Sequence, residues 1–117
     1  MTGEETLTLI AALNRAGLVY AMEGQTAVWA DALSDVRYVD AVEAAKNLIR
    51  DRTSDQRSLT PGDVRAEVRR VRAARVAAAP PPLPSADPDD VAAYQAERKR
   101  LLAGLADGTT TPNQIGA

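Results

Sequence analysis

Apolar residues recur at helical spacing along the N-terminal part of the chain, and this pattern predicts a series of short amphipathic helices. The first, residues 4–16, places Leu9, Ile10 and Leu13 on one face. Burying Trp29, the largest side chain, removes about 150–250 Å² from water, so we expect it to anchor the core. The second and third predicted helices, residues 26–34 and 39–51, have as their apolar stripes Val28, Trp29, Ala32 and Leu33, and Val42, Ala45, Leu48 and Ile49.

The fourth predicted helix, residues 61–79, has the clearest start signal in the sequence. Thr60 is a favoured N-cap, Pro61 suits the first helical position, and Asp63 completes a variant of the capping box. The four helices together predict an all-α fold with a helical N-terminal domain over residues 1–79. The apolar line of the fourth helix consists of Val64, Val68 and Val71, at i, i+4 and i+7.

The composition changes beyond residue 79. The prolines that follow exclude a helix and predict an extended linker over residues 80–87. Acids and a proline at residues 87–90 are typical of a helix start, so we expect an amphipathic helix over residues 88–107. Residues 108–117 are expected to be disordered. The apolar positions of the C-terminal helix have heptad-like spacing and are Val91, Tyr94, Leu101, Leu102 and Leu105.

This C-terminal helix has two interpretations. In one it folds back and caps the helical domain, and in the other it orders on a partner protein. The proline-rich linker favours the second interpretation, because a helix on a spacer has little of its own chain to pack against. The predicted partner-binding residues are Tyr94, Arg98, Leu101, Leu102 and Leu105.

The net charge of −2 is unevenly distributed. Residues 60–79 carry five arginines against two acids, whereas residues 1–59 carry six basic residues against nine acids. Arg65, Arg69 and Arg72 line one flank of the fourth helix and are a candidate face for nucleic acid or an acidic partner. The alternative is a solvated flank that the acids of the N-terminal part balance. We favour the flank, because DNA readers usually make on the order of 6–10 phosphate contacts from several elements.

The residue types present argue against most catalytic chemistry. The chain has no His and no Cys, so the common general bases, nucleophiles and soft metal ligands are missing. We therefore expect a non-enzymatic protein without a cofactor or a metal. The lack of Cys fits a reducing cytoplasm, and no stretch reaches the ~18 apolar residues of a membrane span. We expect a cytoplasmic protein with no membrane partner.

The order of motifs in residues 20–76 resembles a known family. After Tyr20 the chain reads Trp29-Ala-Asp-Ala-Leu33, Asp35-Val-Arg-Tyr38, Asp40-Ala-Val-Glu-Ala-Ala45, a polar loop, and Thr60-Pro61-Gly-Asp-Val64 before the Arg-rich helix. This order is similar to that of the small phage proteins that load or inhibit the host-type replicative helicase, including the variants in actinobacterial phages and prophages. The features that recur in that family are matched here by Trp29, Leu33, Tyr38 and Pro61.

The resemblance implies a small helical N-terminal domain and a flexible C-terminal segment that engages the hexameric replicative helicase. Such loaders also contact the origin-binding initiator, hold the helicase inactive until delivery and bind no nucleotide. The resemblance does not extend to residues 88–107, so placing the helicase contact there rests on the architecture of the chain.

Three functions thus remain as hypotheses. The first, which we prefer, is an adaptor that loads or inhibits the replicative helicase. The second is a small DNA-binding regulator that reads DNA with the Arg-rich helix 61–76. The third is a structural protein that self-associates through helix 88–106. Whether the first would load or inhibit, and with what stoichiometry, is left open by the sequence.

Overall fold

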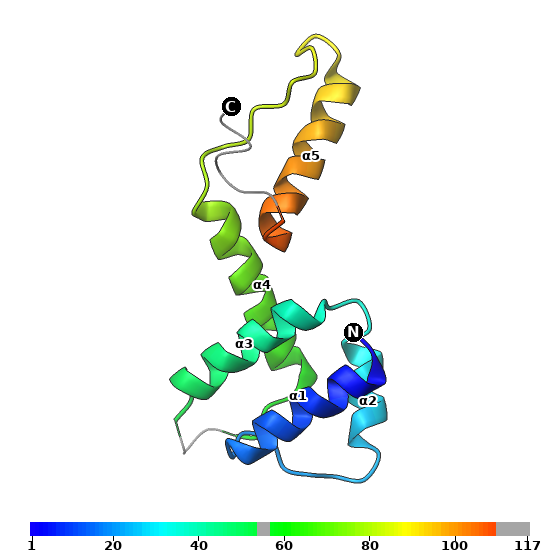
Figure 1. The fold of residues 1–117 in the computed structure, drawn as a ribbon, viewed down its shortest axis with the longest axis vertical. Helices are drawn as coiled ribbons and strands as arrows, with labels where there is room; N and C mark the ends of the chain where they lie inside the picture. Colours follow the sequence, from blue (N-terminus) through cyan, green and yellow to red (C-terminus); the bar gives the residue numbers. More distant parts are fainter. Residues whose placement is uncertain (54–56, 110–117) are drawn as a thin grey trace. The chain divides into compact units, whose positions relative to one another are not determined.

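The computed structural model describes residues 1–53 and 57–109, and within these ranges the fold is all-helical, without strands (Figure 1). The predicted all-α fold class is therefore confirmed. The prediction of disorder at residues 110–117 falls outside the described residues. The helices in the described ranges are α1 (Gly3–Arg15), α2 (Gln25–Ala32), α3 (Tyr38–Asp51), α4 (Pro61–Ala77) and α5 (Val91–Asp107).

The chain divides into two compact units, Met1–Arg69 and Arg70–Ala117, and the division falls inside α4. Val64 and Val68 of α4 belong to the hydrophobic core of the first unit, whereas Val71, also buried, lies in the second. The sequence pattern instead placed the division after residue 79. A single helix thus contributes its first half to one unit and its second half to the other.

Local capping signals fix where α1 and α4 begin. Thr2 and Glu5 form a reciprocal capping box, with 2.8 Å from Thr2 N to Glu5 Oε1 and 3.1 Å from Glu5 N to Thr2 Oγ1. At α4, the backbone N–H of Thr60 donates to Asp63 Oδ2 at 2.8 Å, and the N–H of Asp63 donates back to Thr60 Oγ1 at 3.4 Å. The predicted variant capping box at the start of α4 is therefore confirmed.

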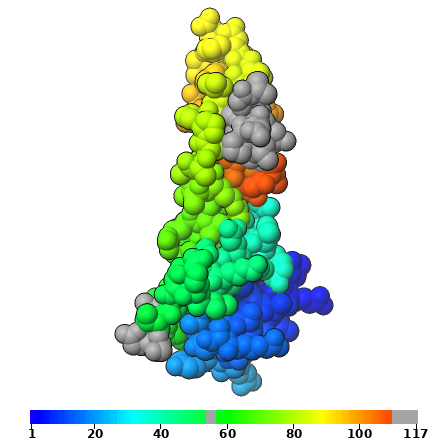
Figure 2. All heavy atoms as spheres, turned by 60° about the vertical axis from the view of Figure 1, so that its left-hand side comes forward, coloured from blue at the N-terminus to red at the C-terminus, as the bar shows by residue number. Residues whose placement is uncertain are grey.

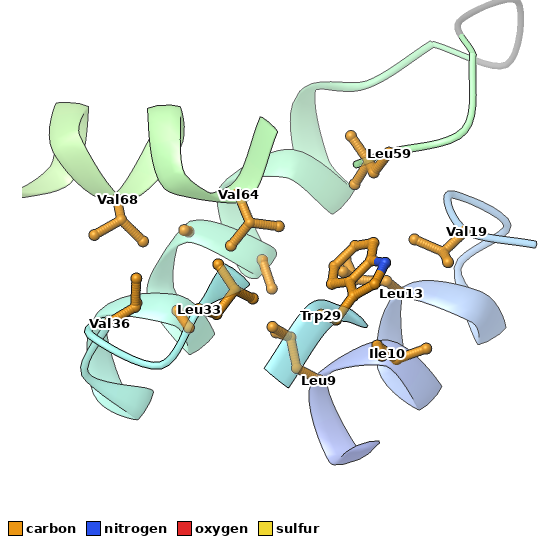
Figure 3. Packing of buried hydrophobic residues seen from close by; sticks show 13 residues of the cluster. Leu9, Ile10, Leu13, Val19, Trp29, Leu33, Val36, Leu59, Val64 and Val68 are labelled. Atoms are coloured by element: carbon orange, nitrogen blue, oxygen red, sulfur yellow. The ribbon is translucent and has the colours of Figure 1, made fainter. Parts of the chain in front are cut away.

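The core of the first unit gathers around Trp29, which is 4% exposed. Figure 3 shows its indole ring among Leu13 and Val19 from the α1 side and Leu59 from the segment that leads into α4. α1 contacts both α2 and α3, and α1 (blue) and α3 (green) are neighbours in Figures 1 and 2. The predicted anchoring role of Trp29 and the buried face of Leu9, Ile10 and Leu13 are confirmed.

Two predicted apolar stripes are partly wrong. In α2, Trp29 points into the core, and its neighbour Val28 is 64% exposed. Leu33, the last residue of the predicted stripe, is buried but follows the end of the helix. In α3, Ile49 is 43% exposed, and the fully buried face is made of small residues together with one carboxylate. Small side chains let α3 approach the core closely, so its buried face is rotated from the predicted one. The buried residues of α3 are Asp40, Ala41, Ala44 and Ala45.

The second unit contains the end of α4, a connection without helix, and α5. Residues 80–90 form no helix, and α5 begins at Val91 after the N-cap Asp90, whose Oδ1 accepts the N–H of Ala93 at 3.2 Å. The predicted helix start at residue 88 is therefore wrong, because Asp90 caps the helix and Pro88 lies before it. Glu97 of α5 accepts the backbone N–H groups of Ser85 and Ala86 at 3.0 and 2.8 Å. The connection is thus tied to α5 instead of standing free as a spacer.

Candidate protein-interaction site

The first arginine of the predicted basic face is used inside the first unit. Arg65 makes a bidentate ion pair with Asp35, with 3.1 Å from Nη2 to Oδ2, and Nη1 donates to the carbonyl of Ala32 at 3.0 Å. The hydrogen bonds from Arg65 lower the pKa of the Asp35 carboxyl. These contacts attach α4 to the C-terminal end of α2, where the helix dipole favours a cation.

The remaining two arginines of that face differ from each other. Arg72 forms an ion pair with Asp107 in the second unit, with 2.6 Å from Nη1 to Oδ1. Arg69 is exposed and makes no hydrogen bond or ion pair within residues 1–53 and 57–109. Because carboxylates already neutralise Arg65 and Arg72, the arrangement favours the balanced flank over a phosphate-tracking face.

The five residues predicted to bind a partner all lie in the second unit, and they differ in how exposed they are. Leu105 is 3% exposed, which corrects its expected place on an open apolar seam. Leu105 lies in the last turn of α5, next to Ala106, whose carbonyl accepts a hydrogen bond from Arg75 Nη1 of α4 at 2.8 Å. The other four keep some exposure, and their role in binding stays a prediction. Tyr94, Leu101 and Leu102 are half-buried, and Arg98 is exposed.

An apolar groove of about 390 Å³ lies in the first unit, between the start of α2 and the segment that enters α4. Met22 and Val28 project at its margin, 71% and 64% exposed, and buried Trp29 contributes to its floor. The groove is lined by residues 22–25, Val28 and Trp29 on one side and by Ser58, Leu59, Thr60 and Pro61 on the other.

Hydrogen bonds to backbone carbonyls stabilise both walls of this groove. The backbone N–H of Leu59 donates to the carbonyl of Leu18 at 2.8 Å, and Gln25 Nε2 donates to the carbonyl of Tyr20 at 2.9 Å. Gly24 adopts φ 75°, a left-handed conformation that glycine accepts readily and that turns the chain into α2. The groove is therefore built by ordered backbone on both sides.

An ion pair beside the groove fixes the start of α4. Arg57 Nη1 and Nη2 contact the two carboxylate oxygens of Asp63 at 2.6 and 2.9 Å. Hydrogen bonds from Arg57, and then from Thr60, hold the pKa of Asp63 well below its ordinary value. The charge of Arg57 is consequently balanced within its own segment.

The sequence pattern did not point to this groove. It placed Val28 in the core stripe and assigned no role to Met22. The one available signal was the large apolar side chain of Met22 in an otherwise polar turn, beside Glu23 and Gly24.

Within the described ranges, no three His, Cys, Asp or Glu side chains are grouped so that they could hold a metal ion. No helix there is long and apolar enough to cross a membrane. The features that gather on the surface of the first unit are instead apolar side chains beside a groove, which suit contact with another protein.

The four residues that carry the family resemblance occupy structural positions. Trp29 and Leu33 are buried in the core, Tyr38 is the half-buried first residue of α3, and Pro61 is the first residue of α4. Comparison of the chain with family models, with curated proteins and with solved structures found no match. The resemblance therefore rests on the sequence motifs.

Proposed function

We propose that this chain is a non-enzymatic adaptor that binds the hexameric replicative helicase and acts as its loader or inhibitor. The observation that carries the proposal is the mixed surface of α5. Val91 is 65% exposed, Tyr94 and Leu101 are half-buried, and three consecutive cations occupy residues 98–100. Exposed apolar side chains beside a basic cluster are typical of a helix that contacts another protein.

The choice of a helicase as partner is supported by the motifs of residues 20–76. The core residues Trp29 and Leu33, the aromatic Tyr38 and the helix-opening Pro61 match the features that recur in phage helicase loaders. A ring of identical subunits is also a favourable target for a small adaptor, because repeated weak contacts gain affinity from multivalency.

Binding of the full-length chain to a purified hexameric replicative helicase tests the proposal. Leu101→Asp should weaken the complex by roughly 1–3 kcal/mol, as expected for loss of an apolar anchor. Ala103→Asp introduces the same charge at an exposed position of α5 and is the matched control. Equal loss of binding in both variants, or no loss in either, would contradict helicase binding through the apolar face of α5.

A helicase unwinding assay separates loading from inhibition. A loader raises the fraction of DNA unwound when single-stranded DNA is coated by its binding protein, whereas an inhibitor lowers unwinding on bare forked DNA. Failure of the full-length chain to bind the hexamer at micromolar concentration would contradict both roles.

A further inference from the structure

We propose that the groove between the start of α2 and residues 58–61 is a second docking site, which takes a short amphipathic segment of a partner protein. That segment carries apolar anchors on one face and Lys or Arg beside them. The site lies wholly in the first unit and does not use α5, so this inference does not depend on the identity of the partner that α5 binds.

The apolar half of the argument comes from the groove lining. Met22 and Val28 are two of the most exposed large apolar side chains of the first unit, and both border the same groove. Trp29 and Leu59 also line the groove, and both are buried in the core that Figure 3 shows. A groove of about 390 Å³ accommodates a few anchoring side chains, such as those that a helix presents at i, i+4 and i+7.

The groove is also held in place before any partner arrives. The Arg57–Asp63 ion pair, the reciprocal Thr60–Asp63 capping bonds and the Leu59-to-Leu18 hydrogen bond fix the wall at residues 58–61. A preformed site loses little conformational entropy when a partner binds. The lining is therefore suited to direct docking of a short segment.

Charge identifies the chemistry of the partner. Glu23 is the one charged residue in the groove lining, and Asp31 follows Val28 by one turn on the exposed side of α2. Neither carboxylate has a hydrogen bond or ion pair within the described residues. The nearby cations Arg57 and Arg65 are balanced by Asp63 and Asp35.

The charge of the whole unit has the same sign as that of the groove. Residues 1–69 contain eight basic residues against eleven acidic ones, a net charge of −3. A cationic segment is attracted to such a surface, and an anionic one is repelled. We therefore assign a basic amphipathic segment to this groove.

Trp29 provides a direct test, since it is the single tryptophan of the chain and lies at the groove floor. The probes are two helix-forming peptides of about 16 residues with Leu at i, i+4 and i+7. One peptide carries Lys on the flanks and the other carries Glu at the same positions. Each is titrated into the full-length chain while tryptophan fluorescence and amide chemical shifts are recorded.

The Lys peptide should change the Trp29 emission, with shift changes concentrated at residues 22–29 and 58–61, and should bind at least about tenfold more tightly than the Glu peptide. Val28→Ser should weaken Lys-peptide binding about tenfold. Leu7→Ser, at an α1 position that is 55% exposed, is the matched control and should have no effect. Asp31→Lys should reduce the preference for the Lys peptide.

Three results would overturn the inference. One is equal affinity for the two peptides, another is a set of shift changes outside the groove, and the third is the absence of binding by either peptide. Occupation by a second copy of this chain would appear as groove shifts that grow with protein concentration when no peptide is present, and it would also refute a separate partner segment. The binding of the Val28→Ser variant to the helicase is measured as well. A variant that loses the Lys peptide but still binds the helicase separates the groove proposal from the proposed adaptor function.

Discussion

Arg72 in the second half of α4 and Asp107 in the last turn of α5 form an ion pair, with 2.6 Å between Nη1 and Oδ1. Arg75, nearly one turn further along α4, donates to the carbonyl of Ala106 beside it. The C-terminal end of a helix carries unsatisfied carbonyls and a partial negative charge, so two arginines there are favourable. These two contacts attach the last turn of α5, where Leu105 is buried, to α4.

Loss of the Arg72–Asp107 pair should loosen α5 without unfolding the first unit. Both side chains are about one-third exposed, so we expect the coupling between them to be about 0.5–1 kcal/mol. A double-mutant cycle of Arg72→Ala and Asp107→Ala, measured by urea unfolding, gives this value. Amide exchange should accelerate in α5 and stay unchanged in α1. Acceleration in α1 as well would show that the two units open together.

Adjacent residues of α2 should differ sharply in their effect on stability. Trp29 is buried among Leu13, Val19 and Leu59, so Trp29→Ala should lower the free energy of unfolding by about 3–5 kcal/mol. Val28→Ala should change it by less than about 0.5 kcal/mol, because Val28 is mostly exposed. Urea denaturation of both variants, followed by circular dichroism, checks the contrast. Similar losses would place Val28 in the core after all.

This contrast shows where prediction from the sequence reached its limit. The helices and the cap of α4 could be predicted, because Thr60 and Asp63 are three residues apart and act locally. The facing of α2 could not, because Val28 and Trp29 are neighbours and both apolar. Which of them enters the core depends on how α2 packs against α1, and a local pattern does not contain that information.

The predicted face of α3 failed for a related reason. Large aliphatic residues such as Ile49 suggested an inner face, but the helix approaches the core through small alanines. Likewise, Asp35 lies 30 residues before its partner Arg65, so no spacing rule links them. The row of Arg65, Arg69 and Arg72 could be recognised in the sequence. The carboxylates that pair with Arg65 and Arg72 could be identified only from the tertiary structure.

The Arg57–Asp63 pair should contribute to the acid limb of the stability curve. Its hydrogen bonds place the folded-state pKa of Asp63 below the unfolded value of 3.8. The contribution is therefore present above about pH 4 and is lost as the pH falls through the lower folded-state pKa. Asp63→Asn should lower the stability at pH 7, and its difference from the parent should narrow below pH 4. A difference that widened on acidification would contradict this assignment.

Arg65 and Arg69 lie one turn apart on α4 and should separate a structural role from nucleic-acid binding. Arg65 bonds both Asp35 and the Ala32 carbonyl, so Arg65→Ala should lower the midpoint temperature of unfolding more than Arg69→Ala does. Arg69→Ala should cost less than about 0.5 kcal/mol, since the exposed Arg69 has no bond to lose within the described part of the chain. Thermal unfolding measures both changes.

In a gel shift with duplex DNA we expect no retardation near 150 mM salt, where screening weakens surface charges. Specific retardation that Arg69→Ala abolishes would instead support the DNA-binding regulator.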